Sequence, residues 1–174
     1  PYDDPAVIAG QGSVAKEIAE QLGDSLATVV VPVGGGGLIA GMAAWLSENR
    51  PDVRVIGVES EGAASTSAAL AAGEPVKLPQ VDMFVDGTAV GLAGSCTYDL
   101  VRDLVDEVVV VPEGAVCTEM LDLYHLDGII AEPAGALSTT AISLAAAGLL
   151  QGLPLDGVTV GIASGGNNDL TSYN

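Results

Sequence analysis

Short runs of β-branched residues alternate with segments of helical periodicity along the chain, and this alternation constrains the fold more than any other feature. The predicted strands cover residues 26–33, 53–59, 106–112 and 157–164. The predicted helices cover residues 12–23, 38–50, 62–74, 113–128 and 135–148. Short, wholly apolar strands separated by helices are typical of a parallel sheet that is covered on both faces. We therefore predict one α/β domain with a central parallel sheet and helices on both faces.

The composition is that of a folded, acidic protein. Hydrophobic residues make up 49% of the 174 residues and charged residues 16%, which excludes a disordered chain. The apolar stretches are interrupted before they reach the ~20 residues of a membrane span. The net charge of −18, from 23 acidic and 5 basic residues, argues against nucleic acids and anionic membranes as partners. A bound anion would have to be held by backbone dipoles instead.

The cysteines and the histidine indicate no metal site. Cys96 and Cys117 are too few for a disulfide framework and lack metal-ligand spacing, so we expect reduced thiols, with Cys117 on an apolar helix face. His125, the only histidine, is expected to be partly buried without a catalytic partner. The opening residues PYDDPAVIAGQG contain no export signal, so a cytoplasmic location is expected.

Four consecutive glycines, Gly34, Gly35, Gly36 and Gly37, separate the first predicted strand from a predicted helix. Each ordered glycine costs about 0.5–1 kcal/mol relative to alanine, so a run of four needs a reason. Backbone N–H groups in such a loop, at the start of a helix, can bind phosphate without a lysine. No Gly-Lys-Ser/Thr follows, which excludes a Walker loop, and a tight turn with close packing stays an alternative.

The same loop also matches a dinucleotide-binding pattern. Gly35, Gly37 and Ala40 fit G-x-G-x-x-A after a strand, and Glu59 ends the next predicted strand where a ribose-binding acid is expected. A nicotinamide dinucleotide domain is therefore an alternative. Glu59 can equally be a solvated carboxylate at the end of a strand.

The last predicted strand leads into a second glycine-containing loop, SGGNND. Ser164 places one hydroxyl at the carboxyl end of this strand, where ligands of parallel sheets bind. A dinucleotide does not require this hydroxyl, whereas a flat heteroaromatic cofactor with one ring nitrogen can use it. A helix cap is the alternative interpretation of Ser164.

Five motifs in order carry a resemblance to a known family: DDPAVIAGQGS, VPVGGGGLIAG, DGTAV, EPAGALS and IASGGNND. They closely resemble the second half of the catalytic domain of the biosynthetic threonine dehydratases (threonine ammonia-lyases), which are fold-type II pyridoxal-phosphate enzymes. The resemblance runs from about Asp3 to Asp169. It implies a cytoplasmic lyase of isoleucine (branched-chain amino acid) biosynthesis that is a homo-oligomer when full length. The implied reaction deaminates L-threonine to 2-oxobutanoate and ammonia by β-elimination, with pyridoxal 5'-phosphate as cofactor.

The resemblance also implies roles for individual residues. The N–H groups from Gly34 through Gly37 and that of Leu38 would hold the cofactor phosphate, and Ser164 would hydrogen-bond the pyridine nitrogen. Gly87, in DGTAV, would lie beside the cofactor. Glu132, in EPAGA, would lie near the ring and the reacting amino acid.

Other parts of the family's site do not occur in this sequence. The Schiff-base lysine of the family belongs to an earlier Ser-Phe-Lys motif, followed by an Asn-containing loop for the substrate carboxylate. Lys16 and Lys77 lie outside any such motif, so no catalytic residue is predicted here. We expect residues 1–174 to be the C-terminal part of the catalytic domain, inactive alone and without the regulatory domain of many members.

Two further expectations concern metals and relatives. Some relatives bind a cation through acids that follow the strand ending at Glu59, but Ala63 and Ser65 occupy the later positions here, so no metal is expected. Serine dehydratase, serine racemase and threonine synthase share the phosphate-binding loop and remain alternatives within the family.

Overall fold

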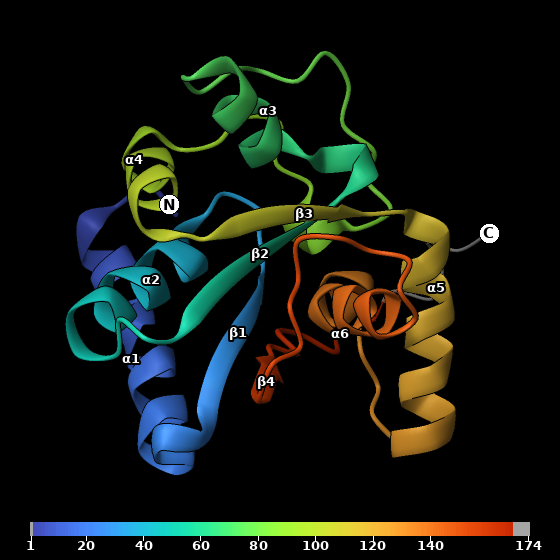
Figure 1. Ribbon diagram of the computed structural model, residues 1–174. Helices are drawn as coiled ribbons and strands as arrows, with labels where there is room; N and C mark the ends of the chain where they lie inside the picture. The colour runs from blue at the N-terminus through green and yellow to red at the C-terminus, as the bar shows by residue number, and fades with distance from the viewer. Residues whose placement is uncertain (1, 169–174) are drawn as a thin grey trace.

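The computed structural model describes residues 2–168 and contains one parallel sheet with the strand order β3-β2-β1-β4 (Figure 1). The strands are β1 (Leu26–Pro32), β2 (Arg54–Ser60), β3 (Glu107–Val111) and β4 (Val158–Gly161). Each lies within or close to a predicted strand. Because all four are parallel, their carboxyl ends meet at one edge of the sheet.

Helices cover both faces of the sheet, as predicted. They are α1 (Pro5–Leu22), α2 (Gly37–Asn49), α3 (Ser65–Ala72), α4 (Ser95–Leu104), α5 (Glu113–Asp122) and α6 (Pro133–Ala146). Figure 1 shows α1 and α2 on one face and α5 and α6 on the other, with α6 against all four strands. Short 3-10 turns occur at Gly23–Ser25, Glu61–Ala63 and Asp86–Thr88, and a π-helical turn, Leu123–Asp127, continues α5. Within the described residues, none of the helices has the length and apolar character needed to cross a bilayer.

Strands β1 and β2 are buried on both faces, and successive side chains of each strand point to opposite faces of the sheet. Val29 and Val31 of β1 pack in one cluster with Ile39 of α2. Val30, between them, packs in the other cluster with Leu137 of α6. A strand that is covered on both faces is mostly apolar, which explains the run of valines in β1.

The first helix is longer than predicted. It begins at Pro5 instead of residue 12, because the carboxylate of Asp4 accepts hydrogen bonds from the N–H groups of Ala6 (2.8 Å) and Val7 (3.2 Å). An aspartate followed by proline is a typical start of a helix, so the sequence DDP carried this signal.

Helix α4 was not predicted, although its sequence is amphipathic. It buries Thr97, Tyr98 and Val101 at helical spacing. The expectations for Cys117 and His125 were wrong, since both residues are exposed. The α5 segment packs into the core through other side chains, such as Val116 and Leu123, which turns Cys117 and His125 outward.

Candidate functional site

The glycine run forms the turn between β1 and α2, at the carboxyl edge of the sheet. Gly36 has a φ of 87°, a left-handed conformation that favours glycine, and immediately precedes α2. Gly35, Gly36 and Gly37 are buried. The N–H groups from Gly34 to Leu38 donate no hydrogen bond to any other residue of the described chain. Such N–H groups at the start of a helix are donors available to an anion.

The glycine run is closely packed against neighbouring residues at each of its four Cβ positions, which explains why side chains are missing there. A Cβ atom at Gly34 would lie 3.1 Å from the Cα of Thr88, and one at Gly36 would lie 2.9 Å from the Cβ of Thr97. A Cβ atom at either of the other two glycines would meet Tyr2. Close packing and free N–H groups therefore occur together in this loop.

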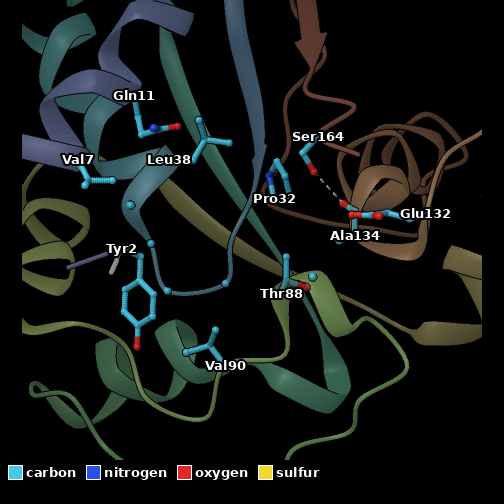
Figure 2. A pocket seen from close by; sticks show the side chains of 15 residues that line it. Tyr2, Val7, Gln11, Pro32, Leu38, Thr88, Val90, Glu132, Ala134 and Ser164 are labelled. Atoms are coloured by element: carbon cyan, nitrogen blue, oxygen red, sulfur yellow. Dashed lines mark hydrogen bonds between the residues drawn. The ribbon is translucent and has the colours of Figure 1, made fainter. Parts of the chain in front are cut away.

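A cavity of about 420 Å³ opens at this edge of the sheet (Figure 2). All the site residues predicted from the sequence line it: Gly34, Gly35, Gly36, Gly37, Leu38, Gly87, Glu132 and Ser164. They come from four separate segments, which the parallel sheet brings to one edge. None of the described lining residues is a lysine or an arginine. An anion in the cavity would therefore contact backbone donors.

Further residues that were not predicted as site residues complete the lining of the cavity. They are Tyr2, Val7, Gln11, Pro32, Thr88, Val90 and Ala134. All except Tyr2 lie inside the five motifs, so the motifs already contained the signal. Tyr2 precedes the first motif, and only the fold brings it to the glycine run.

Ser164 lies three residues beyond β4, in a loop that is fixed to the start of α6. Its Oγ donates a long hydrogen bond of 3.4 Å to the carbonyl oxygen of Ala134 (Figure 2). The N–H of Glu132 donates to the carbonyl oxygen of Gly165 at 3.1 Å. A Cβ atom at Gly135 would collide with the same carbonyl, so α6 approaches the loop closely. The Ser164 hydroxyl is thus held weakly and is open to the cavity.

Glu132 and Gly87 meet beside this hydroxyl. Glu132 is the N-cap residue of α6, and its side chain lies near Ser164 on one wall of the cavity (Figure 2). A Cβ atom at Gly87 would lie 3.3 Å from Oε1 of Glu132 and 2.8 Å from the Cβ of Ala134. A side chain at position 87 would therefore press on the wall that carries the carboxylate.

Glu59 does not belong to this site. It is fully buried, and its Oε1 accepts a hydrogen bond from the N–H of Thr66 at 2.7 Å. Its Oε2 accepts from the N–H (2.8 Å) and the Oγ (2.7 Å) of Ser67. Burial raises the pKa of this carboxyl, and the hydrogen bonds from Ser67 and Thr66 oppose the rise. The dinucleotide alternative, which needed Glu59 as a ribose ligand, is wrong, because the carboxylate binds the first turn of α3.

Neither lysine lies at the cavity. Lys16 forms an ion pair with Glu20 (3.7 Å) on the exposed side of α1, and Lys77 is exposed in the segment after α3. In the part of the chain that the structure describes, no group of three or more His, Cys, Asp or Glu side chains is placed to hold a metal ion.

A family model for pyridoxal-phosphate-dependent enzymes matches residues 1–167. The chain belongs to this family. The resemblance of the five motifs to pyridoxal-phosphate enzymes is thereby confirmed.

Two curated relatives illustrate the similarity. The chain is 54% identical over 176 residues to the biosynthetic L-threonine dehydratase of Mycobacterium leprae, covering 99% of this chain and 40% of the relative. It is 47% identical over 174 residues to the enzyme of the same name from Lactococcus lactis, covering 98% of this chain and 41% of the relative. The chain thus spans about 40% of the length of the curated relatives that it matches.

Two solved structures show the same fold. The processed form of threonine deaminase isoform 2 from Solanum lycopersicum has a TM-score of 0.88 and 39% identity, covering 97% of this chain and 48% of that one. Maize serine racemase has a TM-score of 0.85 and 34% identity, covering 95% of this chain and 51% of that one. The predicted fold-type II architecture is confirmed.

Proposed function

We propose that this chain is part of a threonine dehydratase, which deaminates L-threonine to 2-oxobutanoate and ammonia by β-elimination in isoleucine biosynthesis. The names of the relatives support the substrate. One structural observation carries the proposal. The free N–H groups from Gly34 to Leu38 and the hydroxyl of Ser164 line one cavity, at opposite ends of a space that suits a phosphorylated heteroaromatic ring.

The residues of the cavity fit pyridoxal phosphate. A phosphate needs several convergent donors, which the backbone of residues 34–38 supplies next to the N-terminus of α2. Ser164 would hold the pyridine nitrogen, with Gly87 and Glu132 beside the ring. The volume of about 420 Å³ lies within the range of cofactor pockets.

Pyridoxal phosphate, when bound, supplies an electron sink for negative charge at the Cα of an amino acid. Ser164 offers a neutral hydroxyl to the ring nitrogen, so it does not force a proton onto that nitrogen as a carboxylate would. Moderate electron withdrawal suits the departure of a β-hydroxyl. The carboxylate of Glu132, open to the cavity, can accept a hydrogen bond from a polar group of the substrate.

The proposal extends to the rest of the enzyme. Residues 1–174 would form the C-terminal part of the cofactor-binding catalytic domain and would be inactive alone. The lysine that binds the cofactor and the loop for the substrate carboxylate would belong to polypeptide outside this sequence. We further propose a cytoplasmic homo-oligomer.

The activity can be tested in the full-length protein by following 2-oxobutanoate from L-threonine, with L-serine as the competing substrate. We expect a higher kcat/KM for threonine than for serine. Ser164→Ala should lower kcat/KM by about tenfold or more, because a buried ring nitrogen loses its partner. Gly36→Asp should abolish cofactor binding, since it places a carboxylate and a strained φ in the loop.

The outcomes separate the alternatives. Cofactor binding with turnover of serine but not threonine would favour a serine dehydratase. Interconversion of serine enantiomers would favour a racemase, the activity named for the similar maize structure. A full-length protein that binds no pyridoxal phosphate would overturn the proposal as a whole.

A further inference from the structure

Thr97 is a buried residue that touches the glycine run from outside the cavity. It lies in the first turn of α4, and 1% of its surface is exposed. Its Oγ1 donates a hydrogen bond of 2.8 Å to the carbonyl oxygen of Gly35, and the carbonyl oxygen of Gly94 lies farther away, at 3.2 Å. Thr97 itself does not line the cavity. Its hydroxyl therefore acts on the glycine run and not on a ligand.

The hydrogen bond determines which way one peptide of the glycine run faces. In a trans peptide the C=O of Gly35 and the N–H of Gly36 point in opposite directions, and the described chain has no cis peptide. The carbonyl of Gly35 points at α4, so the N–H of Gly36 points away from α4, toward the cavity side. The contact of Gly36 with the Cβ of Thr97 keeps the loop against the helix.

A peptide between two glycines is especially free to rotate, because no Cβ atom restricts either residue. If this peptide turned over, it would present a carbonyl oxygen to a bound anion in place of an N–H group. A buried carbonyl that lost the threonine hydroxyl would also be left without a partner. The hydroxyl of Thr97 thus opposes rotation of the Gly35–Gly36 peptide, which would replace an N–H donor at the anion site with a carbonyl oxygen.

Asp3 holds the helix turn that carries Thr97. Its carboxylate accepts hydrogen bonds from the N–H of Ser95 (3.0 Å), the Oγ of Ser95 (3.2 Å) and the N–H of Thr97 (3.0 Å). The neighbouring Tyr2 lies against Gly35. Asp3 and the start of α4 therefore support the glycine run from outside the cavity, whereas Tyr2 contacts the run and also lines the cavity.

We propose that Thr97 is a positioning residue, whose hydroxyl orients the Gly35–Gly36 peptide so that the Gly36 N–H is available to the cofactor phosphate. This inference rests on the proposed function, because it assigns the phosphate to the glycine run.

The test uses the full-length protein with Thr97→Val, which keeps the shape and removes the donor, and Thr97→Ser, which keeps the donor. Thr140→Val is the matched control. Thr140 is also 1% exposed and donates 2.7 Å to a backbone carbonyl, that of Ala136, but it lies in the middle of α6, away from the cavity. The measurements are the dissociation constants of inorganic phosphate and pyridoxal phosphate for the cofactor-free protein, and the 31P resonance of the bound cofactor.

We expect Thr97→Val to weaken binding of both ligands by about tenfold and to move the 31P resonance, while Thr97→Ser stays within about twofold of the parent protein. Thr140→Val should lower stability without changing either dissociation constant. Unchanged affinity in Thr97→Val, or equal loss in Thr97→Val and Thr97→Ser, would overturn the role of the hydroxyl.

Hydrogen exchange of residues 34–38 in the unsubstituted protein covers the case in which Thr97→Val fails to fold. Inorganic phosphate should slow this exchange, and an unaffected segment would contradict the proposal. If the parent protein binds pyridoxal phosphate but Thr97→Val binds equally well, only the role of Thr97 fails. If the parent protein binds neither ligand, the proposed function fails as well.

Discussion

At the scale of single residues, the chain uses its buried polar groups for architecture and its backbone for the cavity. Glu59 is the clearest case, since this fully buried acid binds the N–H groups at the start of α3. Its position at the end of a strand suggested a ligand contact. Only the location of α3 shows that the carboxylate has an internal partner.

The raised pKa of Glu59 leads to a prediction about pH. Above its ordinary value of 4.5, the unfolded chain loses the proton while the folded state still binds it. The free energy of unfolding should therefore fall as the pH rises from 4.5 through the raised pKa, and then level off. Denaturant unfolding of the parent protein and of Glu59→Gln across this pH range isolates the contribution of the Glu59 proton. The difference in the free energy of unfolding between the two proteins should shrink with rising pH.

Ser67→Ala provides a second check of the same carboxyl. Removing the Ser67 hydroxyl takes away a hydrogen bond that lowers the pKa, so the falling part of the curve should extend to higher pH. A pH-independent difference between the parent protein and Glu59→Gln would show that the buried carboxyl titrates normally.

At the scale of elements, the crossing of α1 and α2 determines where the cavity-lining side chains of α1 lie. The two helices meet at glycines: a Cβ atom at Gly12 would lie 3.1 Å from the carbonyl oxygen of Gly41, and a Cβ atom at Gly41 would meet the carbonyl oxygen of Ile8. Helices without side chains at the contact can pack closely. This close approach places Gln11 of α1 beside Leu38 of α2 at the cavity.

Gly41→Ala should therefore destabilise the protein by about 1–3 kcal/mol, since backbone atoms of α1 cannot move aside without shifting the helix. Gly10→Ala is the matched control in the same helix pair, because nothing lies within 4 Å of its Cβ position. It should stabilise the protein by about 0.5–1 kcal/mol. Denaturant unfolding measures both changes, and a neutral Gly41→Ala would refute the close-packing explanation.

At the scale of the whole molecule, the net charge of −18 is spread over a chain with only 5 basic residues. Most of these bases already lie beside acids, as in the Arg50–Asp52 pair (2.7 Å) and the Arg102–Asp99 pair (3.0 Å). The remaining acids repel one another. An anion in the cavity would meet backbone N–H donors at short range despite this surrounding negative charge.

Salt should stabilise the protein by screening this repulsion. Raising NaCl from about 10 mM to about 200 mM shortens the screening length several-fold, and a gain of about 1 kcal/mol corresponds to a Tm increase of ~2–4 °C. Thermal unfolding at both concentrations tests this. Glu48→Gln and Glu74→Gln, both at exposed positions, should raise Tm at low salt and lose that advantage at high salt. A Tm that falls with added NaCl would contradict the explanation.

The sequence by itself determined the α/β class, the position of each strand and the loops whose residues line the cavity. Strands buried on both faces are mostly apolar, and the glycine run and the Ser164 loop are local features that follow strand ends. The start of α1 at Pro5 and the amphipathic α4 were also present as local signals, although they were not used.

The tertiary structure alone decided which distant residues support the site. Thr97 is 62 residues from Gly35 in sequence, and Asp3 is 94 residues from Thr97. Helix packing also decided that Glu59 binds the start of α3 and that Cys117 and His125 are exposed. Contacts between distant residues depend on the order of strands in the sheet and on how the helices pack over it, and neither is encoded in the periodicity of a single segment.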